Sequence, residues 1–187
     1  MADPNPVSHT VQPHPVLRYP DSYHDALHNR FRSEQVDAFL ASSTRPSFFY
    51  GSLMLPSVVS RVIGENDVNT IVKNMTPAVL TGHQRYAVMY ADFPAVLPSE
   101  VPGDFVRGML LFGLSKRENG RIEVYESGLY TLEKAKVEIE LYGGSKRLVE
   151  ADVYVWKGSR SDVIEVQEKL WSIEGFLSSS FYEGRML

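Results

Sequence analysis

The sequence predicts an α+β fold in which a curved or closed β-sheet is flanked by helices. The 187 residues contain 43% apolar and 22% charged side chains, which is enough for one globular domain with a sizeable core. After Pro77 several short runs resemble strands, and some of them alternate apolar and polar residues with a period of two. Apolar residues at helical spacing occur near the beginning and near the end of the chain.

The first 45 residues divide into a flexible arm, 1–20, and a helical extension, 21–45. The arm has too little apolar surface to offset the entropy of ordering it, and it carries five prolines: Pro4, Pro6, Pro13, Pro15 and Pro20. From Ser22 to about Ala41, apolar residues recur at roughly helical spacing. They predict one helix or two short ones, with Asp21 or Ser22 as the N-terminal cap.

The main domain is expected over 46–187 and opens with a strand, a tight turn and a helix. The aromatic run 47–50 predicts a short strand that ends at Gly51. Pro56 then begins an apolar periodic segment, and Gly64 follows its last residue. Proline in the first turn and glycine just after the last turn are typical of a helix.

The remainder of the domain is predicted to be mainly β-structure, followed by a final helix. Gly143-Gly144 lies between the last two strand-like runs and indicates a hairpin. A helical stripe runs from Val163 to Leu177, with Ser161 or Asp162 as its cap. The strand-like runs are 78–80, 86–90, 106–114, 131–142 and 148–156.

Composition argues against several functional classes. The net charge is −4 and no basic tract occurs, so a nucleic-acid or membrane-surface partner is not expected. The absence of cysteine removes disulfides and thiolate chemistry. No apolar run approaches the length of a membrane span, and the beginning of the chain does not resemble a secretory signal, so we expect a soluble, cytoplasmic protein. His24 and His28 could share a helix face, but no third ligand accompanies them, so we do not expect a metal site. Neither GxGxxG nor GxxxxGK(S/T) occurs, so we do not expect a nucleotide cofactor.

Two features could carry chemistry. Backbone amides in the turn Tyr50-Gly51-Ser52-Leu53 lie near a helix N-terminus and could bind an anion, although an ordinary strand-helix turn has the same sequence features. Glu126 would share one face of a helical turn with Ile122 and Tyr125, and burial there would raise its pKa enough for general acid-base catalysis. The alternative for Glu126 is a glutamate at the end of a surface turn.

The order and spacing of four motifs resemble the gamma-glutamyl cyclotransferase-like superfamily. The resemblance extends from about Phe48 to Trp156, and the C-terminal segment with Trp171 and Phe176 is similar to that of members found in fungi. The motifs are Phe49-Tyr50-Gly51-Ser52-Leu53-Met54, Phe93-Pro94-Ala95-Val96-Leu97-Pro98, Val106-Arg107-Gly108, and Tyr125-Glu126 followed by Tyr130.

This resemblance implies a small mixed β-barrel with flanking helices and a cavity at its mouth. It implies that Glu126 is the catalytic residue, that Tyr130 belongs to the pocket, and that Tyr50, Gly51, Ser52 and Leu53 bind the glutamyl end of a small-molecule substrate. No cofactor is implied. Ser127 and Leu132 stand where the family often has Gly and Arg. These departures concern the substrate rather than the fold.

The implied reaction is attack of a substrate's α-amine on its own γ-glutamyl amide, which releases 5-oxoproline and an amine. The amine could come from glutathione, a γ-glutamyl amino acid, an isopeptide or a biosynthetic intermediate. Two other hypotheses remain: a different proton transfer in specialised metabolism, as in an isomerase, cyclase or lyase, and a non-catalytic module that binds a small ligand. A buried, unpaired Glu126 would favour catalysis, and a paired or exposed one would favour the module. The N-terminal arm and helix could cover the pocket or form a homodimer contact.

Overall fold

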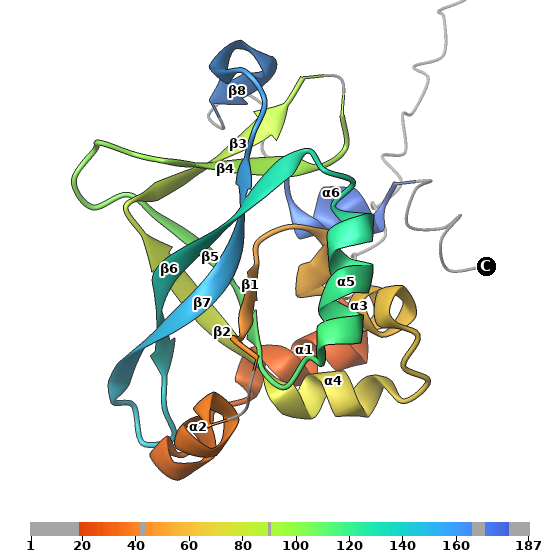
Figure 1. Cartoon of the computed structure of the whole chain (residues 1–187), viewed down its shortest axis with the longest axis vertical. Coiled ribbons are helices and arrows are strands. Elements are labelled where there is room, and N and C mark those ends of the chain that lie inside the picture. The colour runs from red at the N-terminus through yellow and green to blue at the C-terminus, as the bar shows by residue number, and fades with distance from the viewer. Residues whose placement is uncertain (1–18, 42–43, 90, 166–170, 180–187) are drawn as a thin grey trace, which may run out of the picture.

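A closed five-stranded β-barrel forms the centre of the molecule (Figure 1). The computed structural model describes residues 19–41, 44–89, 91–165 and 171–179, so nearly all of the expected flexible arm lies outside the described residues. Neighbouring strands are antiparallel except for the first and last in chain order, which pair in parallel and close the barrel. In order around the barrel the strands are β1 (Ser47–Phe49), β5 (Phe105–Leu111), β2 (Met75–Thr81), β6 (Tyr130–Glu140) and β7 (Lys146–Trp156).

The hairpin of β6 and β7 follows the expected alternation of side chains. Val137 and Ile139 are buried inside the barrel, whereas Lys134 and Lys136 are exposed. Gly143 and Gly144 both have positive φ and form the turn between the strands, as the sequence predicts.

A second, three-stranded sheet lies above the barrel in Figure 1, with strand order β4 (Pro94–Pro98), β3 (His83–Val88), β8 (Val163–Glu165). Here the prediction of one long C-terminal helix is wrong at its start. Val163 pairs with Val88 in an antiparallel strand, and a 3-10 helix capped by Ser159, η2 (Arg160–Asp162), precedes it. Helix α6 (Ile173–Leu177) confirms only the end of the prediction, with Ser172 as its cap, and Val166 and Leu170 lie outside the described residues.

Several helices gather along one side of the barrel (Figure 1). The helix predicted to begin at Pro56 is confirmed as α3 (Pro56–Ile63), and Gly64 closes it in the left-handed conformation. A 3-10 turn, η1 (Ser52–Met54), connects β1 to α3. Helix α4 (Val68–Asn74) was not expected from the sequence, and α5 (Lys116–Tyr125) is the helix that leads to Glu126.

The N-terminal extension consists of two short helices, α1 (Asp21–His28) and α2 (Ser33–Leu40), which is one of the two arrangements expected. The predicted cap is wrong: Pro20 occupies the N-cap position and no side chain caps the helix. Between the helices, the Asn29 side chain donates hydrogen bonds to the carbonyl oxygens of Val72 and Met75, at 3.1 and 2.8 Å. These bonds attach the extension to α4 and β2.

Among the described residues, no helix is both long enough and apolar enough to cross a membrane.

Candidate active site

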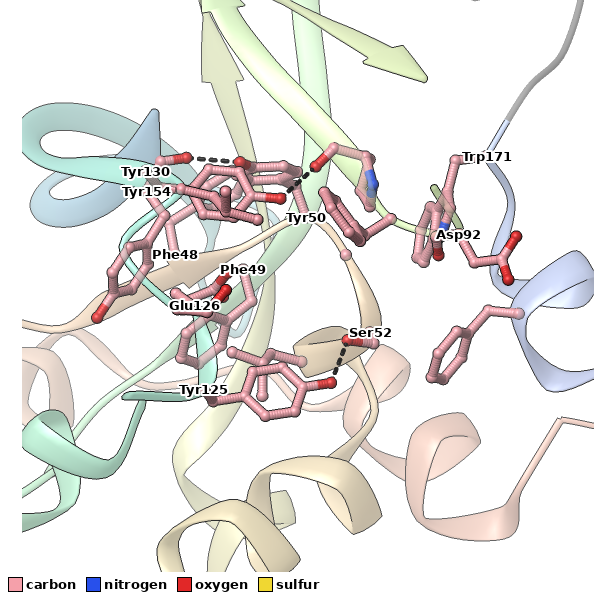
Figure 2. A pocket seen from close by; sticks show the side chains of 17 residues that line it. Phe48, Phe49, Tyr50, Ser52, Asp92, Tyr125, Glu126, Tyr130, Tyr154 and Trp171 are labelled. Carbon is pink, nitrogen blue, oxygen red and sulfur yellow. Dashed lines mark hydrogen bonds between the residues drawn. The ribbon is translucent and has the colours of Figure 1, made fainter. Parts of the chain in front are cut away.

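A cavity of about 310 Å³ lies between one end of the barrel, the turn after β1, the end of α5 and the C-terminal segment (Figure 2). Its volume is at the lower end of the range for small-molecule sites. All six site residues named from the sequence line it, and aromatic side chains form most of the remaining wall. The lining residues are Phe48, Phe49, Tyr50, Gly51, Ser52, Leu53, Asp92, Phe93, Pro94, Tyr125, Glu126, Ser127, Leu129, Tyr130, Tyr154, Trp171 and Phe176.

The turn after β1 leaves three backbone donors at the cavity wall. The amides of Met54 and Leu55 donate to the carbonyl oxygens of Gly51 and Ser52, at 2.9 and 3.1 Å, and so form the 3-10 turn. As at any helix start, the preceding amides lack such partners. Within the described part of the chain, the N–H groups of Gly51, Ser52 and Leu53 have no protein acceptor. This turn could therefore bind an anionic group of a ligand.

Two tyrosines hold this turn in place. The Tyr50 hydroxyl donates to the carbonyl oxygen of Tyr154 on β7 at 2.6 Å, and its side chain is buried. The Ser52 hydroxyl lies 2.9 Å from the hydroxyl of Tyr125 at the end of α5 (Figure 2). The Tyr50 hydroxyl thus serves the protein itself, and any contribution of this residue to binding comes from its ring or backbone.

Glu126 is placed by the end of α5. The helix begins with a capping box between Ser115 and Glu118, and it buries Ile122. Glu126 is its C-terminal cap, and the next residues, Ser127 and Gly128, have φ of 53° and 70°. These two left-handed residues reverse the chain into β6, and the first of them is strained because it is not glycine.

The carboxyl group of Glu126 lies in a largely aromatic environment and is only partly exposed. Burial raises the pKa of Glu126 to about 7. Across the ranges that the structure describes, no hydrogen bond or ion pair engages this carboxylate. Burial also raises the pKa of Tyr50, Tyr130 and Tyr154, and the negative charge of Glu126 raises each of them further. The phenols therefore stay neutral, and Glu126 is the group in this site that can exchange a proton near neutral pH.

Tyr130, the first residue of β6, forms a wall of the cavity. Its hydroxyl donates to the carbonyl oxygen of Pro94 at 2.9 Å, which joins the barrel to the start of β4. Its ring makes edge contacts with Tyr154 and Trp156, with ring centres 6.5 and 5.7 Å apart. The structure thus brings Tyr130 to Glu126 and the turn, as a pocket residue.

The family of the chain follows from a comparison of sequence with known families. A family model described as gamma-glutamyl cyclotransferase, AIG2-like, matches residues 47–173, which is more than half of the chain. The chain belongs to this AIG2-like gamma-glutamyl cyclotransferase family. Protein AIG2 C of Arabidopsis thaliana is 31% identical over 109 residues, which cover 58% of this chain and 59% of that protein. The chain thus spans less than two thirds of the length of this curated relative.

Two solution structures of Arabidopsis thaliana proteins have the same fold. Each is 23% identical in sequence to this chain. One has a TM-score of 0.51 over 72% of this chain and 76% of its own, and the other has 0.50 over 67% and 79%. The small mixed β-barrel with flanking helices that the resemblance implies is therefore confirmed as the fold of this AIG2-like cyclotransferase family member, and the barrel has five strands. The similarity to fungal members stays a prediction.

Several residues of this cavity have no role in a site assigned from the sequence. Phe93 and Pro94 belong to a motif of the family that carries no assigned role, and Asp92 and Tyr154 belong to no motif. Trp171 reaches the cavity because its indole N–H donates to the carbonyl oxygen of Asp92 at 3.0 Å, across 79 positions of sequence. Such long-range contacts have no local sequence pattern.

The histidine pair lies on α1. The rings of His24 and His28 are 4.5 Å apart, as expected for two residues on one helix face. In the regions that the structure describes, no group of three His, Cys, Asp or Glu side chains could hold a metal ion.

Proposed function

We propose that this AIG2-like protein is a gamma-glutamyl cyclotransferase. In the proposed reaction, the α-amine of a γ-glutamyl amide attacks the γ-carbonyl carbon of the same molecule. A C–N bond forms to close the five-membered ring of 5-oxoproline, and the original amide C–N bond breaks to release an amine. Atoms balance without water or any other co-reactant.

The observation that carries this proposal is that the Glu126 carboxyl, which has no partner among the described residues, lines the same cavity as the free amides of the turn. A pKa of about 7 makes Glu126 both a usable base and a usable acid at neutral pH. In the proposed mechanism its carboxylate takes a proton from the substrate's α-ammonium group, and the resulting carboxylic acid gives that proton to the leaving nitrogen. One residue thus serves both steps, an effect typically worth roughly 100- to 10,000-fold in rate.

The backbone supplies the second component of the mechanism. The N–H groups of Gly51, Ser52 and Leu53 are suited to hold either the α-carboxylate of the substrate or the oxyanion that develops on the γ-carbonyl oxygen. Because amine and carbonyl already belong to one molecule, the site mainly has to hold them in an attacking geometry. Such positioning is worth up to about 7 to 11 kcal/mol.

Glu126 also bears on the two alternative functions, a ligand-binding module and a different proton transfer. A module that only binds a ligand has no need of a carboxylate that lacks a counter-charge, because burial of an unpaired charge destabilises the fold. A different proton transfer would use Glu126 equally well, and Ser127, in place of the glycine common in the family, adjoins it. The identity of the product separates that alternative from cyclotransfer.

The test is release of 5-oxoproline, detected by mass spectrometry after incubation with a panel of γ-glutamyl compounds that includes glutathione. We expect release by the wild type and a loss of at least about 100-fold in Glu126→Gln, because the amide has nearly the same shape and cannot transfer the proton. Glu133→Gln, which changes an exposed carboxylate on β6, is the matched control and should retain full activity. Turnover by Glu126→Gln within about threefold of the wild type would refute the assigned role.

A further inference from the structure

We propose that the leaving amine of the substrate is apolar and aromatic and carries no carboxylate, and that Trp171 determines this specificity. This inference rests on the proposed cyclotransferase function. It follows from the shape and charge of the part of the cavity that the reacting groups do not need.

The cavity has two sides. Figure 2 shows Glu126 and Tyr125 on one side, and Trp171 and Asp92 on the other. The γ-glutamyl end of a substrate needs Glu126 and the free amides of the turn. The space that remains for the leaving amine is therefore bounded by the C-terminal segment and by the residues that lead into β4.

Aromatic rings dominate this second side. Trp171 and Phe176 lie with ring centres 6.2 Å apart, and Phe93, which follows Asp92 in the chain, also lines the cavity. The bond between the Trp171 indole and the Asp92 carbonyl fixes the orientation of the tryptophan ring. Preorganised aromatic walls of this kind bind flat, apolar groups better than hydrated, charged ones.

The charges of the lining residues also favour a leaving amine without a carboxylate. Among the described lining residues the charged side chains are Glu126 and Asp92, both acidic, with no lysine or arginine. Every γ-glutamyl substrate brings one α-carboxylate, for which the turn offers N–H donors. A second carboxylate, such as that of a γ-glutamyl amino acid or of the glycine of glutathione, would meet aromatic faces and like charge.

The rival hypothesis is that the leaving amine carries a carboxylate and that Arg85 binds it. The Arg85 guanidinium lies 5.8 Å from the centre of the Trp171 ring and donates to the Arg107 carbonyl oxygen at 2.5 Å, while its Nε is buried and has no acceptor among the residues that the structure describes. Arg85 does not itself line the cavity. Arg85 nevertheless interacts electrostatically with Tyr50 of the cavity wall, so a variant of Arg85 tests whether this cation binds a substrate carboxylate.

Three synthetic substrates separate the contributions. The γ-glutamyl amide of phenethylamine and γ-glutamyl-phenylalanine differ only by one carboxylate, and the γ-glutamyl amide of ethylamine lacks the ring. For the wild type we expect kcat/KM for the phenethylamide to exceed both others by at least about tenfold, measured as 5-oxoproline release. Equal values, or a preference for γ-glutamyl-phenylalanine that Arg85→Gln abolishes, would overturn the inference while leaving the cyclotransferase function intact.

Variants of Trp171 test the specificity residue. Trp171→Ala, and Trp171→Leu as a variant that keeps an apolar side chain, should lower the phenethylamide-to-ethylamide ratio of kcat/KM by about tenfold. Tyr142→Ala, which removes an exposed aromatic ring far along the β6–β7 hairpin, is the control and should not move the ratio. An unchanged ratio in both Trp171 variants would contradict the assignment. If none of the three compounds releases 5-oxoproline, the cyclotransferase function itself fails, and this inference fails with it.

Discussion

A single carboxyl group connects the chemistry of this protein to its stability. The pKa of Glu126 is raised from 4.5 to about 7 by burial, and no described cation offsets its charge. A proton therefore binds this carboxyl more tightly in the folded chain than in the unfolded chain. The free energy of unfolding must consequently fall as pH rises from about 4.5 to about 7, because Glu126 acquires a poorly solvated charge over this interval.

The substitution Glu126→Gln should therefore stabilise the protein at pH 8 but not at pH 4.5. The neutral amide avoids the charged state, and the gain at pH 8 is expected to be up to about 3 kcal/mol. Urea unfolding of both proteins at the two pH values measures it. Glu133→Gln should show no such pH-dependent difference, since its carboxylate is exposed. A gain of equal size at both pH values would mean that ionisation of Glu126 is not its source.

The same titration predicts the pH dependence of activity. If the carboxylate of Glu126 is the base, kcat/KM should fall about tenfold per pH unit below pH 7 and level off above it, because only the ionised fraction of free enzyme reacts. Initial rates of 5-oxoproline release between pH 5.5 and 8 measure this profile. Circular dichroism over the same range checks that the fold persists. A profile that is flat across this interval would rule out a base with this pKa.

Local signals predict some elements of this fold and fail for others. Pro56 and Gly64 mark both ends of α3, and Gly143-Gly144 marks the β6–β7 turn, because these residues fix the backbone where they stand. Strand β8 is different. Its apolar residues Val163 and Ile164 fit a helical stripe equally well, and pairing with β3 decides the outcome. That pairing partner lies far away in the sequence.

Helix α5 contains a glycine in its interior that lowers the stability of the helix. Gly120 lies in the interior of this helix, is exposed, and has open space where a Cβ atom would be added. Gly120→Ala should therefore raise the free energy of unfolding by about 1 kcal/mol, because glycine loses more backbone entropy in a helix than alanine. Chemical denaturation measures the gain, and kcat should stay unchanged if the position of Glu126 is unaffected.

Gly108 provides the opposite case within β5. A Cβ atom there would collide with the backbone oxygen of Phe49 and the ring of Phe48 on β1. Gly108→Ala should therefore destabilise the barrel, whereas Gly120→Ala stabilises the helix. Equal effects of the two substitutions would contradict this account of the β1–β5 contact.

At the scale of the whole molecule, the candidate site is an assembly of distant segments. Ser52 and Tyr125 are 73 positions apart and their hydroxyls meet at 2.9 Å, and Trp171 reaches the cavity through Asp92. The sequence could identify the turn and Glu126 because each belongs to a short motif. It could not identify Tyr154 or Asp92 as cavity residues. Tyr154 lies on β7, which reaches the cavity through pairing with strands remote in sequence, and Asp92 lies in the loop between β3 and β4 of the second sheet.

The N-terminal extension is part of the folded core, although its position in the chain suggests an appendage. Phe31, between α1 and α2, is only 3% exposed and packs edge-on against Phe112, with ring centres 5.5 Å apart. Its carbonyl oxygen accepts a hydrogen bond from the Tyr142 amide at 2.8 Å. Phe31 and the interior side chains of the barrel form one hydrophobic cluster. The extension therefore completes the core at the end of the barrel where the β6–β7 hairpin turns.

Phe31→Ala should accordingly lower the free energy of unfolding by about 3 to 5 kcal/mol, the usual cost of emptying a buried phenylalanine site. Leu40→Ala is the matched control, because Leu40 lies on α2 of the same extension and is 39% exposed, so its truncation should cost much less. Urea denaturation compares the two variants, and 5-oxoproline release at low temperature reports whether the distant cavity is intact. If Phe31→Ala lowered the free energy of unfolding no more than Leu40→Ala, Phe31 would not contribute to the core of the barrel. A large loss for Phe31→Ala with unchanged kcat/KM would instead separate the residues that hold the barrel together from those that carry out the reaction.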